Sequence, residues 1–525
     1  MIIGIDFGTC FSSAAIMNGL IPVTTYVKDS TGEGIPSLFM YSAEKNMEMY
    51  GEECTTGEAF RHSSDIVRYM KRTIRENPEN IGLKVTSGGR DFAICEVIEK
   101  YLTYLVSKIR EGAIKSGEFS NNEIDAVTIT APVGIASDSM MASEYNKLLQ
   151  DCMCRITGLP KEKVRILQEP VAAAISYLYS EDVRTHYDSP QTIMVFDLGG
   201  GTLDVTVVEH NPKAMTYEIL AKEGDLQLGG NDWDSALRDA VVRKLNMSVN
   251  GSEEEIAKFG KAVTKLKMDL TNTDENMIFF TMEGQDRFCK FTRREFEDCS
   301  SELLRRARAV VDRTIDSLPG GLEQVDKIVL VGGSSNMPQI KSMMESAYGD
   351  SGAEVLIFEP SKAIAKGAAI FSKMTSSNNG SEFGGKVIDC ATLTYGFESH
   401  KDGNEAMIYN MIYKSTSFDD TGMIRVTSES DFIPRFDDQT MVSFDIYESE
   451  HLRGDSDWFA LGQGETYNGL HCTVQVPPEY LGKARGFRMW VTLALDTNGI
   501  LEITVRDRAG NKIAFASSSK VSGEA

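Results

Sequence analysis

The sequence contains few histidines, and its cysteines are not paired. There are six histidines among 525 residues, and none stands at a spacing typical of a metal site. The nine cysteines include no CxxC pair, and the nearest two are Cys152 and Cys154. Zinc chemistry and a disulfide framework are therefore unsupported. Free thiols in a reducing compartment, the cytoplasm, are expected.

Long apolar runs and an excess of basic residues are also lacking. No segment approaches the roughly 20 apolar residues that span a bilayer. The first residues, MIIGIDFGTC, do not form the basic and then apolar pattern of a secretory signal. Lys and Arg total 54 against 77 Asp and Glu, a net charge of −23. This balance argues against binding to nucleic acid or to an anionic membrane, although one nucleotide needs only a local group of donors.

What the sequence does contain is the ordinary balance of a globular protein, with 42% hydrophobic and 25% charged residues. Its length alone suggests about three or four domains. Short apolar runs typical of strands, at 126–130, 193–196 and 327–331, alternate with helical spacing such as that of 301–318. The alternation predicts an α/β domain over residues 1–374.

The composition changes near residue 375. A stretch rich in Ser, Asn and Gly predicts a linker over 375–386. Beyond it the helical period is replaced by alternating segments, and two of these flank Asn498-Gly499, a pair that favours a tight hairpin turn. We therefore expect an all-β sandwich over 387–517 and a short tail over 518–525.

One pattern occurs twice. Residues 2–17 and 193–208 each consist of an apolar strand, an aspartate, a turn of Gly and Thr, and a second apolar strand. Two hairpins of one design indicate two related lobes, and a cleft between such lobes is a natural place for a ligand.

The two turns have the parts of a phosphate site. Glycines bring backbone N–H groups close to phosphate oxygens. Thr9 and Thr202 add hydroxyls, and Asp6 and Asp197 stand where carboxylates could hold a Mg²⁺ ion with its waters. Asp-Gly turns are common in hairpins, so one copy alone would indicate only a turn, but two matched copies point to a site. The lack of GxGxxG or GxxxxGK[ST] near them excludes a Rossmann or P-loop site.

Two further glycine turns are weaker signals. Residues 332–335 follow an expected strand and precede an expected helix, and residues 228–232 have a similar pattern. Each could approach a nucleotide. Such turns often serve packing alone, however, and Asp232 could simply lie near a helix N-cap.

Several segments together resemble one family. In chain order they are GIDFGTCFS (4–12), RILQEPVAAAISY (165–177), VFDLGGGTLDVTVVE (195–209), LGGNDWD (228–234) and IVLVGGSSNMPQI (328–340). This order resembles that of the DnaK-type chaperones, the heat-shock-protein-70 family. The segment VTLALDTNGILEITVRD (491–507) resembles their peptide-binding β-domain. The paired turns alone would indicate only the wider superfamily of actin, hexokinase and these ATPases.

The resemblance implies a two-lobed, actin-like α/β ATPase domain followed by an all-β sandwich. It implies ATP or ADP with Mg²⁺ as ligands and leaves room for K⁺. Its implied partners are unfolded or extended polypeptide, a J-domain co-chaperone and a nucleotide-exchange factor. The chain departs from the family in having no helical lid after the β-domain, so peptide release would be fast. The family joins its domains by a leucine-rich strand that docks on the ATPase domain. The corresponding stretch here, residues 384–389, has only two consecutive large apolar residues, Val387 and Ile388, so its docking would bury little area.

Residue by residue, the resemblance implies a catalytic set: Lys71 beside the γ-phosphate, Glu169 orienting the attacking water, and Asp6, Asp197 and Thr202. The two aspartates would hold Mg²⁺ through water. The nucleotide would contact Gly8, Thr9, Cys10, Gly199, Gly200, Gly201, Thr202, Gly229, Gly230, Lys267, Thr271, Gly332, Gly333 and Ser334.

Two of these assignments have a plainer alternative. Lys71 stands in a basic run with Arg68 and Arg72, which usually marks a solvated helix face. Glu169 precedes Pro170 and could cap a helix whose first turn contains proline.

The expected nucleotide site also departs from the family pattern. Cys10 and Phe11 stand where the family has Thr and Tyr, and Met268 and Asn336 replace two arginines near the base. We therefore expect weaker adenine binding or looser base selectivity.

In the β-domain the resemblance implies a peptide cleft at Phe397, Val442 and Phe444. The alternation alone permits Val442 and Phe444 to face the sandwich core instead. The expected function is slow ATP hydrolysis by a chaperone that binds apolar segments of unfolded proteins. Two alternatives stay open: a nucleotide-regulated binding module with little turnover, and a small-molecule kinase of the same superfamily, which the β-domain disfavours.

Overall fold

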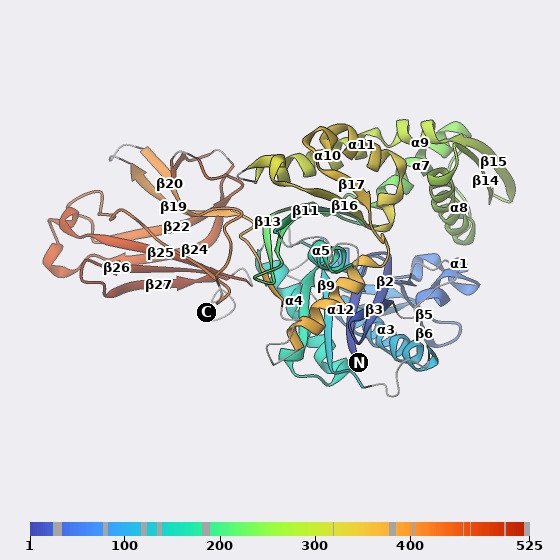
Figure 1. Cartoon of the computed structure of the whole chain (residues 1–525), viewed down its shortest axis with the longest axis horizontal. Coiled ribbons are helices and arrows are strands. Elements are labelled where there is room, and N and C mark those ends of the chain that lie inside the picture. The colour runs from blue at the N-terminus through green and yellow to red at the C-terminus, as the bar shows by residue number, and fades with distance from the viewer. Residues whose placement is uncertain are drawn as a thin grey trace. The chain divides into compact units, whose positions relative to one another are not determined.

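The structure, a computed structural model, describes the chain except for residues 25–33, 77–81, 117–122, 134–138, 181–188, 319, 377–384, 402–404, 420, 455, 463, 498–499 and 519–525. The described residues form two compact units, one with most of residues 1–386 and the other with most of residues 387–525 (Figure 1). No helix of the described part is both long and apolar enough to cross a membrane.

The first sheet of the larger unit contains the N-terminal hairpin. In spatial order its strands are β10 (Val164–Gln168), β9 (Ala126–Ala131), β1 (Ile2–Phe7), β2 (Phe11–Asn18) and β3 (Ile21–Thr24), and β4 (Ile35–Pro36) also pairs with β2. The strand β1 is antiparallel to β2 but parallel to β9, which is parallel to β10. All six residues of β9 are buried, as in parallel strands covered on both faces.

The second sheet repeats this topology. In spatial order its strands are β17 (Glu354–Ile357), β16 (Lys327–Val331), β11 (Gln191–Leu198), β12 (Leu203–Asn211), β13 (Thr216–Asp225) and β18 (Lys386–Ile388). The strand β11 is antiparallel to β12 and parallel to β16, which is parallel to β17. Its first five strands therefore correspond one by one to those of the first sheet. This confirms two related lobes, each built on one of the repeated hairpins.

Helices surround both sheets (Figure 1). Those of the larger unit include α1 (Glu58–Arg61), α2 (Met70–Glu76), α3 (Ile94–Ser116), α4 (Ser139–Thr157), α5 (Glu169–Tyr179), α7 (Gly230–Lys244), α8 (Glu253–Asn272), α9 (Arg293–Cys299), α10 (Ser301–Asp316), α11 (Pro338–Tyr348) and α12 (Ala363–Ser376). The predicted helix over 301–318 is α10, which buries Ala307, Val310 and Val311 at helical spacing.

Two helices lie between the sheets and connect them. The helix α12 packs on β1 and β9 of the first sheet, α5 packs on β11 of the second, and the two helices pack on each other. Their contact is close because Gly367 has no side chain, since an added Cβ would lie 1.7 Å from Ala172 O. The two lobes are thus joined through a tightly packed helix pair.

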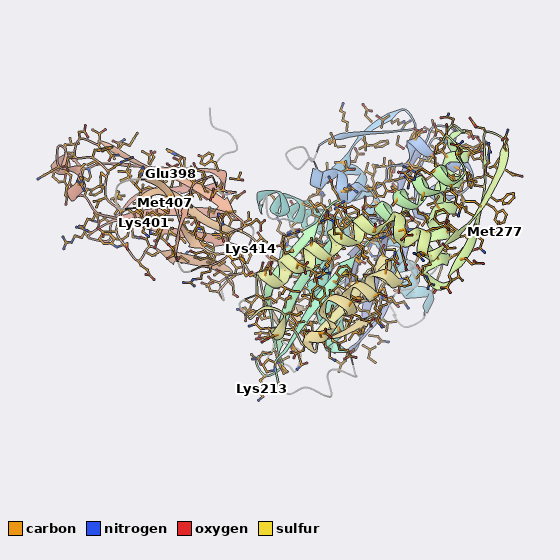
Figure 2. The ribbon with its side chains drawn as sticks, turned by 90° about the horizontal axis from the view of Figure 1, so that it is seen from above. Lys213, Met277, Glu398, Lys401, Met407 and Lys414 are labelled. Carbon is orange, nitrogen blue, oxygen red and sulfur yellow. The ribbon has the colours of Figure 1, made fainter. Side chains whose placement is uncertain are left out.

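Besides the two sheets, the described part of this unit contains three two-stranded hairpins. They are β5 (Phe39–Ser42) with β6 (Met47–Tyr50), β7 (Lys84–Ser87) with β8 (Arg90–Ala93), and β14 (Glu275–Met282) with β15 (Gln285–Thr292). Met277, which Figure 2 labels, lies on β14, whose inner face packs on α8.

The smaller unit is an all-β sandwich of two antiparallel sheets, as predicted. One sheet has the order β23 (Trp458–Ala460), β20 (Glu405–Ile412), β19 (Thr394–Lys401), β22 (Met441–Ser449) and β24 (Thr466–Gln475). The other has the order β21 (Met423–Thr427), β25 (Met489–Asp496), β26 (Leu501–Asp507) and β27 (Lys512–Ser517). Glu398 and Met407, on the paired strands β19 and β20, are labelled in Figure 2. Side chains of both sheets form one core, including Phe397, Phe444, Val491 and Ile503.

Two predicted features fall largely outside the described residues. The hairpin between β25 and β26 pairs as expected, but its turn at Asn498-Gly499 is not described. Of the predicted linker, α12 occupies the first two positions, ending at Ser376, and β18 begins at Lys386. At the end of this helix, the hydroxyls of Thr375 and Ser376 donate to carbonyl oxygens of the preceding turn, Phe371 O and Ser372 O.

Candidate functional site

The two repeated turns touch each other. A Cβ atom added to Gly200 would lie 2.4 Å from Cys10 Sγ, and one added to Gly201 would lie 2.7 Å from Thr9 Cγ2. Side chains at these two positions would therefore displace the first turn. Thr202, which ends the second turn, is buried. The structure thus brings the turn after β1 and the turn after β11 together.

The backbone of these turns leaves N–H groups for a ligand. Ser37 occupies carbonyl oxygens of the first turn, because its hydroxyl donates to Gly8 O at 2.7 Å and its N–H donates to Cys10 O at 2.8 Å. Among the described residues, the backbone N–H groups of Thr9 and Gly200 donate to no protein oxygen. Backbone donors gathered in this way bind anions such as phosphate.

A buried ion pair lies beside the first turn. Lys71, in α2, donates from Nζ to Phe7 O at 2.8 Å and forms an ion pair with Glu169, the first residue of α5. Their side chains are only 3% and 7% exposed. The alternative of a solvated face is therefore wrong for Lys71, and Glu169 does more than begin a helix. Burying such a pair is costly, which is typical of a site that uses both charges.

Two aspartates lie within electrostatic reach of this pair. The pKa of Asp6 is raised to about 7, first by burial and then by the charge of Glu169, while Lys71 opposes the rise. The pKa of Asp197 is raised well above its usual range by burial and then by Glu169, Asp204 and Asp6. Four carboxyl groups thus share one ammonium group. A divalent cation would relieve this excess of negative charge.

These carboxylates fit a hydrated Mg²⁺ ion. In the described part of the chain, no three His, Cys, Asp or Glu side chains converge on one ion position. Mg²⁺ usually keeps several water molecules and contacts one or two carboxylates. Asp6 and Asp197 would therefore hold the ion through its water.

The second lobe contributes a lysine and a hydroxyl. The Gly230 N–H and the Ser334 hydroxyl both donate to Gly199 O, at 2.9 and 3.0 Å. Lys267 Nζ, on α8, donates to Gly230 O at 2.8 Å and pairs with Asp234 at 2.9 Å. Four of the predicted ligand residues, Gly199, Gly230, Lys267 and Ser334, are thus brought together.

Two glycines near them have no room for a side chain. A Cβ added to Gly229 would lie 2.5 Å from Gly201 Cα. Gly332 has a φ of +82°, and its added Cβ would lie 2.6 Å from Asp197 Oδ1. The lack of space at both positions, and the positive φ at Gly332, require glycine. At Gly333, in contrast, an added Cβ would have no neighbour within 4 Å.

Three side chains expected near the base of the nucleotide are either exposed to solvent or hydrogen-bonded to the protein backbone. Thr271 Oγ1 donates to Lys267 O at 3.1 Å inside α8, so a nucleotide would have to compete for this hydroxyl. Met268 is 43% exposed. Asn336 Nδ2 donates to Gly333 O at 3.0 Å.

Several contributors to the site were not predicted from the sequence. Asn231, on α7, donates to Cys10 Sγ at 3.4 Å, and the nearby side chains of Ser13 and Thr130 lower the pKa of Asp6. An asparagine or a threonine in these positions carries no signal until the fold brings it next to its partner.

In the β-domain, the predicted cleft residues lie in or beside the core. Phe397 and Phe444 are 0% and 3% exposed, and their ring centroids are 5.2 Å apart. Phe432 closes the cluster, at 4.9 Å from Phe397. Val442 is partly buried and packs against the same core. This arrangement favours the alternative in which Phe444 faces the core.

Two sheets of one topology with matched, touching turns, followed by an all-β sandwich, define the class: a two-lobed, actin-like α/β domain with an appended β-domain. A model of the Hsp70 protein family matches residues 2–523. The chain therefore belongs to the Hsp70 family, whose members are ATP-dependent chaperones.

Curated relatives agree with this assignment. The chain is 27% identical over 539 residues to a protein named chaperone protein DnaK from Endomicrobium trichonymphae. This alignment covers 99% of this chain and 78% of the relative. It is 26% identical over 546 residues to a protein of the same name from Deinococcus radiodurans, covering 97% and 78%. For one from Methanothermobacter thermautotrophicus the identity is 25% over 544 residues, covering 100% and 81%.

Proposed function

We propose that the chain binds ATP with Mg²⁺, hydrolyses it slowly, and acts as a chaperone of the DnaK type. The observation that supports this most strongly is the buried Lys71–Glu169 pair beside Asp6 and Asp197. Membership of the Hsp70 family supports the same activity. The nine cysteines are all free thiols, which supports work in the cytoplasm, a reducing compartment.

Each residue of the pair would have a separate role once ATP is bound. The γ-phosphate would take the ammonium group of Lys71 as a partner, and that cation would offset negative charge in the transition state. Glu169 would then be released to accept a hydrogen bond from the attacking water and to orient it. The bound Mg²⁺ ion supplies positive charge against the phosphates. In the absence of ATP, Lys71 and Glu169 neutralise each other.

The glycine turns and α8 would position the rest of the nucleotide. The N–H groups of Thr9 and Gly200 would donate to phosphate oxygens. Lys267 and Ser334, which meet at Gly230 and Gly199, would face the ribose side.

The β-domain would bind extended apolar segments of unfolded polypeptide, with a J-domain co-chaperone and a nucleotide-exchange factor as further partners. Large apolar side chains support this role, since Ile433, Phe436 and Met441 are 42%, 54% and 47% exposed. Met441 begins β22, the strand that carries Val442 and Phe444.

ATPase measurements with and without an unfolded, reduced polypeptide test the proposal. We expect slow release of phosphate that the polypeptide accelerates. Tight nucleotide binding without turnover would instead support a nucleotide-regulated binding module with little turnover. Turnover only with a small-molecule acceptor would overturn the chaperone assignment.

A further inference from the structure

The hairpin of β14 and β15 has one buried face and one exposed face. On the buried face, Phe280 and Phe291 are 8% and 2% exposed. Phe280 packs on Phe259 of α8, with ring centroids 4.3 Å apart. The turn of the hairpin is held to the same helix, since the Gly284 N–H donates to Glu255 Oε1 at 2.8 Å. The helix α8 therefore fixes the hairpin with its other face outward.

The outer face carries a pair of exposed aromatic rings. Phe279 and Phe288 stand directly opposite each other in the register, and their ring centroids are 6.0 Å apart. They are 66% and 61% exposed, and Phe279 is the most exposed of the large hydrophobic side chains that the structure describes. Met277, at the edge of the larger unit in Figure 2, lies on the same face and is 41% exposed. We name Met277, Phe279 and Phe288 the apolar patch.

The apolar patch differs from the scattered single hydrophobic residues that every protein surface contains. Its two rings together leave about 200–300 Å² of apolar surface in water, since an aromatic side chain buries about 150–250 Å² when it is fully covered. Adjacent exposed rings with a rim of polar residues are typical of an interaction site. The outer face of the hairpin is therefore a candidate interface.

One charged residue stands beside each end of the apolar patch. Lys290 is opposite Met277, and Asp286 is opposite Thr281 on the other side of the two rings. All four side chains are exposed and lie on the outer face. Lys290 Nζ pairs with Glu275 at 2.6 Å, and Asp286 Oδ1 accepts a hydrogen bond from Thr281 at 2.9 Å. Because an ammonium group has three donors and a carboxylate has two oxygens, Lys290 and Asp286 can each take a further partner.

This order of charges makes the outer face complementary to itself. If a second copy is turned by 180° about an axis that crosses both strands at the two rings, each strand faces the same strand of the other copy in the reverse direction. Each ring then meets its counterpart. Lys290 of each copy meets Asp286 of the other, so the ion pair occurs twice in one interface. An axis along the strands would instead place Lys290 against Met277 and would leave the charges unmatched.

We propose that the outer face of the hairpin is the contact between two copies of the chain in a weak, two-fold symmetric dimer. The rings and their rim bury less than the roughly 1,200 Å² of a stable interface, so association should require tens of micromolar protein, about the range of transient complexes. The net charge of −23 on each copy opposes association, and salt screens this repulsion. The contact contains no residue of the candidate site, so it stands or fails separately from ATP hydrolysis.

Sedimentation of the full chain at increasing concentration, up to about 200 μM in about 0.15 M salt, tests the dimer. We expect the average mass to rise from that of one chain toward that of two. The double variant of Phe279→Ser with Phe288→Ser should stay monomeric over the same range. Phe436→Ser is the matched control, because Phe436 is a ring of the β-domain with a similar exposure of 54%, and it should associate as wild type does.

Two charge variants test the symmetry of the contact. Lys290→Glu and Asp286→Lys each place like charges opposite each other twice in their own dimer, so each alone should associate at least about tenfold more weakly than wild type. An equimolar mixture of the two should associate again, because both contacts then join opposite charges. The substituted side chains are exposed, so the melting temperatures should stay near that of wild type.

Three results would each overturn the proposal. They are a wild-type chain that is monomeric over the whole range, a dimer that persists without the two rings, and a mixture of the charge variants that does not associate.

Discussion

At the residue scale, the candidate site depends on glycines that have no room for a side chain and on buried carboxylates. Within one turn the glycines are not equivalent. A Cβ on Gly200 would lie 2.4 Å from Cys10 Sγ, whereas the nearest atom to a Cβ on Gly199 is Thr202 O at 3.6 Å, an ordinary contact. Neighbouring positions therefore provide a test and its control.

We expect Gly200→Ala to weaken binding of ADP with Mg²⁺ by about tenfold or more, because the methyl group would push Cys10 and the first turn away. Overpacking of this kind usually costs about 1–3 kcal/mol. Gly199→Ala should bind nearly as wild type. Titration calorimetry measures both affinities, and equal losses in the two variants would mean that the contact with Cys10 does not matter.

The buried Asp6 predicts a dependence of stability on pH without nucleotide. Its folded-state pKa of about 7 lies above the unfolded value of 3.8. The folded state therefore binds the extra proton between these values, and wild-type stability falls as the pH rises through this window. Asp6→Asn, which stays neutral, should gain about 2 kcal/mol relative to wild type between pH 5 and pH 7. Urea unfolding at both pH values measures the difference, and a constant difference would contradict the raised pKa.

At the scale of elements, strands were predicted where their alternation is regular and missed where it is broken. The alternation of residues 471–476 predicts a strand there, but it covers only the end of β24, which begins at Thr466. Gly469 has a φ of +89° within this strand, and the partner strand β22 changes register between Asp445 and Tyr447. Such irregularities interrupt the period of two on which prediction depends. The strand β23 has only three residues, too few for a period.

Two helical glycines should respond in opposite ways to alanine. Gly367 of α12 would place a Cβ 1.7 Å from Ala172 O, so Gly367→Ala should destabilise the larger unit by about 3 kcal/mol or more. Gly260, inside α8, has open space around an added Cβ, so Gly260→Ala should stabilise by about 0.5–1 kcal/mol. Thermal unfolding reports both. Destabilisation by Gly260→Ala would contradict the packing around α8.

At the scale of the whole molecule, the repeated hairpin predicted the duplicated lobes, and the change of composition near residue 375 predicted the β-domain. The residues of the candidate site could be predicted only in part from such sequence patterns. Lys71 looks like a member of a basic surface, and its partner Glu169 is 98 positions away, so local sequence predicts neither burial nor pairing. The resemblance of 165–177 to a family motif identified Glu169. A contact such as that of Asn231 with Cys10 arises only from the fold.

Single-turnover hydrolysis of ATP with Mg²⁺ by wild type and by Lys71→Ala tests the central claim most directly. Arg68→Ala is the control, because Arg68 belongs to the same basic run but is exposed, whereas Lys71 is buried. We predict slow hydrolysis by wild type and Arg68→Ala and a loss of at least about a hundredfold in Lys71→Ala, as for removal of one charge-stabilising group. Equal rates in all three proteins would contradict a catalytic centre built on Lys71 and Glu169.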